Sequence, residues 1–122
     1  MKICKIFEWD ASHQLSLPYE SKCNTRHGHR YKIEIELEGK LNKNGMVMDF
    51  SKIKEIINHC SFDHKDINEN IAYFKTNNKN PTAEHLVEWL HWQLSLMWKE
   101  TDPKISRIRV WEIPTSYAEE NY

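Results

Sequence analysis

Three histidines stand where two neighbouring strands would bring them together. His27 and His29 lie one residue apart in the stretch "CNTRHGHRY", and side chains two apart on a strand point to the same face of a sheet. His13 ends the preceding apolar segment. If the two segments pair antiparallel, with residues 14–26 as their connection, His13 ends one strand where His27 begins the next. The sequence therefore predicts three imidazoles at the open end of a hairpin.

Such a cluster is suited to a metal ion. Neutral imidazole is a good zinc ligand, and three nitrogens at about 2.0–2.1 Å leave a fourth tetrahedral position for water or substrate. An open position is typical of a catalytic site, so we expect the trio to bind Zn2+. The remaining histidines that we considered are interpreted as ordinary core or surface residues: His59, His85 and His91.

Cys23 is a second candidate, in a polar loop four residues before His27. Close to a dication, the pKa of a thiol falls from its usual value of about 8.5 towards neutrality, and the thiolate is a base or a nucleophile. Cys4 and Cys60 fall on a predicted strand and a predicted helix face, where an inert apolar role suits them better. The spacing leaves open whether Cys23 binds the metal instead.

The stretch "FDHKDIN" places Asp63 directly before His64. An aspartate can fix the tautomer of an imidazole and raise its basicity, so the pair is a candidate proton shuttle. A solvated loop with an Asx-turn is the alternative interpretation.

Glu112 is a third kind of candidate, because it shares a face of the last predicted strand with Ile108 and Val110. An unpaired carboxylate among apolar side chains is costly, so Glu112 needs a partner. That partner is either the paired N–H donors of a heterocyclic ligand or an internal arginine or lysine.

The hydrophobic pattern predicts an α+β plan, with helices packed on one face of an antiparallel sheet. The 122 residues suffice for one core, and we expect a single domain over residues 1–122. Alternation is clearest in residues 27–38, and helical spacing is clearest after Asp49 and after Pro81. The expected elements are strands at 2–13 and 27–38, a short strand around 46–48, helices at 50–60 and 83–99, and a strand at 105–113.

Composition excludes several classes of protein. Charged residues make up 29% of the chain and the net charge is -1, so a nucleic acid is not an expected partner. The three cysteines form no C-x-x-C pair and are expected to be reduced thiols. No apolar run approaches the roughly 20 residues that cross a bilayer, and no signal peptide is visible. We expect a cytoplasmic protein without a membrane partner.

Six motifs, in order and nearly end to end, resemble the 6-pyruvoyl-tetrahydropterin synthase superfamily. Within it, the three-residue gap between Cys23 and His27 resembles the 6-carboxy-5,6,7,8-tetrahydropterin synthase branch of queuosine biosynthesis, a tRNA modification pathway. His85 and Ile113 depart from the usual asparagine and threonine of the family motifs. The six motifs are "WDASHQL", "CNTRHGHRY", "GMVMDFSKIK", "FDHKDIN", "NPTAEHLVEWL" and "IRVWEIP".

The resemblance implies the tunnelling fold (T-fold), in which an antiparallel four-stranded sheet carries two helices on one face. Protomers of this fold assemble into a barrel, as a hexamer or a tetramer, with active sites between subunits; such assembly would also cover sheet edges. The roles that the resemblance implies are zinc binding by His13, His27 and His29, base catalysis by Cys23, proton transfer by Asp63 and His64, and anchoring of the pterin ring by Glu112.

The implied reaction is that of a carbon–carbon lyase. 7,8-Dihydroneopterin triphosphate would give 6-carboxytetrahydropterin, acetaldehyde and triphosphate. Two alternatives stay open, a 6-pyruvoyl-tetrahydropterin synthase and a noncatalytic pterin- or zinc-binding module. Lys22, Arg26 and Arg30 are candidates to meet the triphosphate, with a solvated basic surface as the alternative role.

Overall fold

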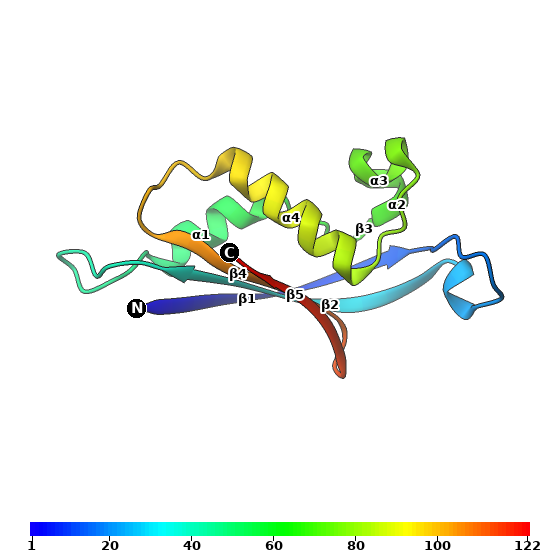
Figure 1. Ribbon diagram of the computed structural model, residues 1–122, viewed down its shortest axis with the longest axis horizontal. Coiled ribbons are helices and arrows are strands. Elements are labelled where there is room, and N and C mark those ends of the chain that lie inside the picture. The colour runs from blue at the N-terminus through cyan, green and yellow to red at the C-terminus, as the bar shows by residue number, and fades with distance from the viewer.

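The computed structural model describes residues 1–122 and contains one sheet with helices on one face (Figure 1). The strand order is β3-β1-β2-β4-β5, and all neighbours are antiparallel except the short β3, which runs parallel to β1. The strands are β1 (Lys2–His13), β2 (His27–Glu38), β3 (Lys65–Asp66), β4 (Lys104–Ile113) and β5 (Ser116–Asn121). The helices are α1 (Phe50–Asn58), α2 (Ile67–Asn70), α3 (Ala72–Asn77) and α4 (Ala83–Met97).

The α+β plan with four antiparallel strands is confirmed, but the fourth strand is not where the sequence pattern placed it. Residues 46–48 form no strand; Val47 and Met48 are instead buried against the core from an irregular segment. The fourth antiparallel strand is β5, whose side chains are exposed except at Ala118. An edge strand of this kind lacks the alternation that reveals a half-buried strand, because only Ala118 packs against the core.

The two main helices begin where the sequence predicted. The side chain of Asp49 accepts a hydrogen bond from the backbone N–H of Ser51 at the start of α1, and Thr82 accepts one from His85 at the start of α4. Such N-caps satisfy backbone donors that the first helical turn leaves free. The buried sides of the helices carry Ile53 and Ile57 from α1, and Leu86, Val87, Trp89, Leu90 and Leu94 from α4.

The inner face of β1 and β2 leads from the hydrophobic core into the histidine cluster. Every second side chain of each strand points towards the helices, and these rows are buried except at His27 and His29, which are partly exposed. The rows are Phe7, Trp9, Ala11 and His13 in β1, and His27, His29, Tyr31, Ile33, Ile35 and Leu37 in β2. The histidines are therefore the last members of two core-facing rows.

The register between β1 and β2 is the one that the sequence analysis assumed. His13 lies opposite His27, and Ala11 lies opposite His29. Residues 14–26 connect the two strands and include a short 3-10 helix at Lys22–Asn24. The connection folds back on itself, because the backbone N–H of Leu15 donates to the carbonyl of Cys23 at 2.9 Å. Cys23 is thereby held next to the end of β1.

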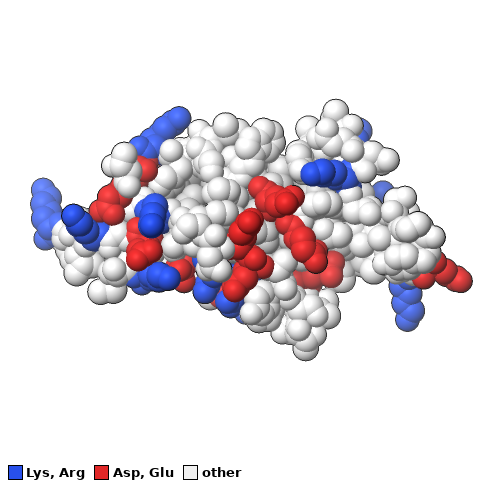
Figure 2. Space-filling view, in the orientation of Figure 1, with Lys and Arg blue, Asp and Glu red and all other residues white.

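Surface charge is divided between the two signs. On the face shown in Figure 2, acidic side chains gather over the middle of the molecule, and many lysines and arginines lie towards one end. The basic side chains on this face are interrupted by acidic and uncharged ones. None of the helices combines the length and the apolar composition needed to cross a lipid bilayer.

Two leucines of α4 provide a matched test of the packing. Leu94 is fully buried and Leu96 is 58% exposed. Leu94→Ala should lower the free energy of unfolding by about 2–5 kcal/mol, because it leaves a cavity in the core, whereas Leu96→Ala should change it by less than about 0.5 kcal/mol. Urea denaturation at a fixed protein concentration measures both. Equal losses in the two variants would contradict the packing described.

Candidate functional site

The three imidazoles meet at the open end of the β1–β2 hairpin. Their ring centroids are 4.6 Å apart for His13 and His27, 5.1 Å for His13 and His29, and 4.8 Å for His27 and His29. One nitrogen from each ring lies within 4.8 Å of the other two. The predicted convergence is therefore present, and these three nitrogens form a group that could hold a metal ion.

Backbone carbonyls fix which nitrogen of two of the rings carries the proton. Nδ1 of His13 lies 2.8 Å from the carbonyl oxygen of Pro81, and Nδ1 of His27 lies 2.6 Å from that of Thr25. A carbonyl oxygen can only accept, so each Nδ1 carries the hydrogen and donates it. Each Nε2 is then left with a free lone pair, the form in which imidazole binds a metal.

The distance between the two Nε2 atoms tests whether a cation fits. Nε2 of His13 and Nε2 of His27 are 3.0 Å apart, although in these tautomers neither has a hydrogen to donate. Two facing lone pairs repel one another, and a cation bound by both removes the repulsion. Nitrogens on a tetrahedral zinc with bonds of about 2.0–2.1 Å lie about 3.4 Å apart. The donor types and their spacing therefore fit a zinc ion.

Burial favours the neutral state of the cluster. His13 is fully buried, and desolvation lowers its pKa; the pKa of His29 is lowered for the same reason, while nearby Glu112 opposes both shifts. The hydroxyl of Tyr31 lies 3.1 Å from Nδ1 of His13, and burial raises the pKa of Tyr31, which keeps it neutral. The metal ligands would thus be uncharged nitrogens.

Glu112 lies beside the imidazoles rather than against a basic side chain. Its Oε1 is 3.3 Å from Nε2 of His13 and 3.7 Å from Nε2 of His29. No arginine or lysine forms an ion pair with it, so the internal partner considered from the sequence is not found. The carboxylate stands where β2 and β4 separate, just beyond the last pair, Lys32 and Trp111.

Glu112 borders two hollows. One, of about 510 Å³, is also lined by His29, Lys32 and Trp111, and the ammonium of Lys32 lies 4.2 Å above the indole of Trp111. The other is a cleft of about 180 Å³ that Cys23 also lines. A ligand could therefore contact the carboxylate from either side of the metal-binding group.

Cys23 is near the cluster but is not part of it. The thiol does not join the group of nitrogens that lie within 4.8 Å of one another. It faces the cleft that Glu112 shares with the first turn of α4. Glu84 in that turn also lines the cleft, and sequence reasoning assigned it no role, since an acidic residue at a helix start is explained by the helix dipole alone.

Asp63 and His64 form the expected pair. Nδ1 of His64 is 3.0 Å from Oδ2 of Asp63, and the other oxygen of Asp63 accepts the backbone N–H of Asp10 at 2.8 Å. His64 has a φ of 59° and an 80% exposed side chain. It lines a hollow with His29 and Arg30, but not the cleft of Cys23. One chain therefore does not bring Cys23 and His64 into a common cleft.

Two of the three candidate phosphate ligands already have carboxylate partners. Arg26 forms an ion pair and a hydrogen bond with Asp66, and Nε of Arg30 donates to Asp10 at 2.9 Å. Lys22 forms no ion pair in this chain. Both arginines thus form ion pairs that link neighbouring segments of the chain.

The family model for 6-pyruvoyl tetrahydropterin synthase matches residues 2–121. The chain belongs to this family. A Pyrococcus abyssi protein provisionally named 6-carboxy-5,6,7,8-tetrahydropterin synthase is 38% identical over 92% of this chain and 84% of its own length. The Haemophilus influenzae protein of that name is 34% identical over 97% of this chain and 96% of its own length.

The solved structures confirm the fold. Caenorhabditis elegans 6-pyruvoyl tetrahydropterin synthase aligns over 100% of this chain and 95% of its own, with a TM-score of 0.86 and 21% identity. The expected tunnelling fold is therefore confirmed. At this level of identity the likeness establishes the fold alone, and the site rests on the geometry above.

The lowered pKa values of His13 and His29 predict a pH-dependent stability. Both fall below the ordinary value of 6.5, so in acid the unfolded chain binds protons that the folded chain does not. Metal-free protein should therefore be most stable above about pH 6.5 and lose stability below it. Urea unfolding of EDTA-treated protein across this range measures the slope.

A variant and a control separate the contribution of His13 and His29 to the pH dependence of stability from that of the other titratable groups. His29→Gln should flatten the slope, because it removes one of the two groups. His91→Gln should leave the slope unchanged, since His91 stacks on Tyr122, outside the cluster. The same slope in all three proteins would show that the cluster does not titrate as described.

Proposed function

We propose that the protein is a zinc-dependent 6-carboxy-5,6,7,8-tetrahydropterin synthase, a carbon–carbon lyase. Its substrate would be 7,8-dihydroneopterin triphosphate, and its products 6-carboxytetrahydropterin, acetaldehyde and triphosphate. The observation that carries the proposal is the convergence of His13, His27 and His29, with free Nε2 lone pairs on His13 and His27. The relatives that bear this enzyme's name support the choice of reaction.

His13, His27 and His29 would hold the zinc ion. A zinc ion there supplies Lewis acidity, which lowers the pKa of neighbouring C–H and O–H groups of a bound substrate. Glu112 is suited to anchor the pterin ring, because a carboxylate accepts two parallel N–H donors from the edge of such a ring. Its position next to His13 and His29 would place the side chain of the pterin over the imidazoles.

Cys23 and His64 would move the protons. Cys23 faces the cleft of Glu112 and would serve as the base once its thiol is ionised. In the pair with Asp63, Nδ1–H of His64 donates to the carboxylate, and Nε2 is then free to take up or deliver a proton. The exposure of His64 leaves it free to meet a substrate held by another chain.

A homo-oligomer, hexameric or tetrameric, would complete the site between subunits. Within one chain, Cys23 and His64 line separate hollows. The outer edge of β1 pairs with β3 only at Ala11 and Ser12, and β5 has no outer neighbour. Exposed strand edges are sites of pairing with another chain, so closure of the sheets into a barrel would use them.

We further propose a single T-fold domain at 1–122, a cytoplasmic location and a place in queuosine biosynthesis.

Incubation of the zinc-loaded protein with 7,8-dihydroneopterin triphosphate tests the reaction. Mass spectrometry should detect 6-carboxytetrahydropterin, and an aldehyde assay should detect acetaldehyde in equal amount. A 6-pyruvoyl product without acetaldehyde would identify the sister activity instead. Intact substrate would indicate a noncatalytic pterin- or zinc-binding module.

Cys23→Ala should lower turnover by about 10²–10⁴-fold, because a positioned acid–base group contributes that much. Zinc content should not change, since the thiol lies outside the nitrogen group. Cys4→Ala is the matched control, because Cys4 lies at the far end of β1. Undiminished turnover in Cys23→Ala would remove Cys23 from the mechanism.

His27→Gln should weaken zinc binding by more than the roughly 10–100-fold that follows loss of an outer-shell partner, because it deletes a direct ligand. Competition with a chromogenic chelator measures the affinity. His91→Gln should retain the affinity of the parent protein. Equal affinities in the two variants would place the metal elsewhere.

A further inference from the structure

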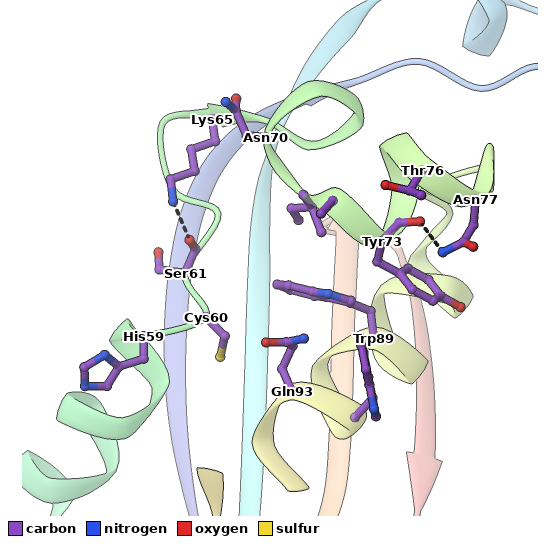
Figure 3. Close-up of a pocket in the computed structure, with 13 residues that line it drawn as sticks. His59, Cys60, Ser61, Lys65, Asn70, Tyr73, Thr76, Asn77, Trp89 and Gln93 are labelled. Carbon is purple, nitrogen blue, oxygen red and sulfur yellow. Dashed lines mark hydrogen bonds between the residues drawn. The ribbon is translucent and has the colours of Figure 1, made fainter. Parts of the chain in front are cut away.

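A pocket of about 480 Å³ lies in the helical layer, between α3, α4 and the segment that follows α1 (Figure 3). None of the three clustered histidines, Cys23 or Glu112 lines it. It is therefore distinct from the hollows around the imidazoles, and the proposed reaction gives it no role.

The floor of this pocket is a tryptophan with an unused hydrogen-bond donor. Trp89 is only 7% exposed, and its indole packs on the core rings of Phe62 and Phe74, with centroids 6.3 and 6.4 Å away. Its Nε1–H has no acceptor in the protein, and this atom is not sealed from solvent. Because solvent reaches this atom, water can accept the hydrogen bond until a ligand takes its place. The pocket thus offers a donor to a ligand.

The walls combine aromatic rings with side-chain amides. Tyr73 and Trp92 pack at 6.0 Å between ring centroids, and Trp92 is 51% exposed. Gln93 has no hydrogen bond within the chain, and Figure 3 shows its amide beside the indole of Trp89. Asn70 and Asn77 add further amides to the lining. Flat rings beside amides suit a planar ligand with polar edges.

Charge in the pocket is scarce. Lys65 is the only lysine or arginine in the lining, and its Nζ donates to the carbonyl oxygen of Ser61 at 3.4 Å. No carboxylate lines the pocket. A cationic ligand would therefore lack a partner, and an anionic ligand would meet a single ammonium, that of Lys65, so the lining favours an uncharged ligand.

The pocket is equipped to bind rather than to react. Burial raises the pKa of the Cys60 thiol to about 11, and its Sγ lies 3.2 Å from the carbonyl oxygen of Ile57. The thiol is therefore protonated near neutral pH and is not an active nucleophile.

We propose that this pocket is a second ligand site, which takes an uncharged, planar nitrogen heterocycle of about purine size. The ring would stack among Trp89, Trp92 and Tyr73, accept the indole N–H of Trp89 and exchange hydrogen bonds with Gln93. Ser61 and Lys65 flank the Asp63–His64 pair, so a bound ring contacts both ends of the loop that carries it. The proposal does not depend on the reaction assigned above.

Adenine and hypoxanthine are suitable probes, with cyclohexanecarboxamide as a nonplanar control. In 15N-labelled zinc-loaded protein, each of the five tryptophans gives an indole N–H signal, and Trp89→Phe identifies that of Trp89. Either purine should shift the signals of Trp89 and Trp92 saturably, with half-saturation at or below about 1 mM, and leave that of Trp111 unmoved. The nonplanar amide should shift none of them.

Gln93→Leu should weaken purine binding by about 3- to 10-fold, because it removes one hydrogen bond at similar volume. Trp92→Ala, at an exposed position, should weaken it independently through loss of stacking. Glu88→Gln on α4, outside the pocket, should leave it unchanged, and an unmoved Trp9 signal shows that each variant is folded. No saturable shift at the solubility limit of both purines, or equal affinity in all variants, would overturn the proposal.

Discussion

The antiparallel register of β1 and β2 is the constraint on which the site depends. It sets His13 opposite His27 and Ala11 opposite His29, so that all three imidazoles share one face. Slipping one strand by a single residue would turn its whole row of side chains to the other face. The register is held by apolar burial, since the same slip would expose Ile33 and Ile35, which are fully buried. Core packing therefore positions the three imidazoles that we propose as metal ligands.

The site also contains an electrostatic repulsion between two imidazole lone pairs, which a bound cation would remove. Pro81 and Thr25 direct the lone pairs of His13 and His27 at one another across 3.0 Å, inside a partly buried cluster. A core built for stability alone would place apolar side chains here, because neutral imidazoles with facing lone pairs lose hydrogen bonds to water. A cation at this position would accept both lone pairs and so replace the hydrogen bonds to water that the imidazoles lost on burial. If a metal ion binds here, binding and folding would be coupled at the end of the hairpin.

Sequence reasoning succeeded where local pattern and tertiary packing agree. The alternation in β2 and the apolar segment before His13 were enough to predict the hairpin and its three imidazoles. The neighbouring Asp63 and His64 were likewise visible as a pair, because their contact is local. The strand predicted around residues 46–48 was wrong, because a buried apolar segment need not pair with a strand.

Other features arise only from tertiary structure. β5 is exposed almost throughout and carries no alternation, so it became visible only as a hydrogen-bonded neighbour of β4. The partner of Glu112 could not be chosen from its strand alone, because the imidazoles approach it from β1 and β2. The pocket floored by Trp89 was hidden for the same reason, since the spacing of α4 explains that residue as core.

X-ray absorption spectroscopy at the zinc edge tests the central claim most directly. Protein loaded with one equivalent of zinc should show a first shell of nitrogen or oxygen at about 2.0–2.1 Å, with the outer-shell scattering of three imidazoles and no sulfur. A sulfur scatterer at about 2.3 Å would place Cys23 on the metal, and fewer than three imidazoles would show that the hairpin does not build the site described.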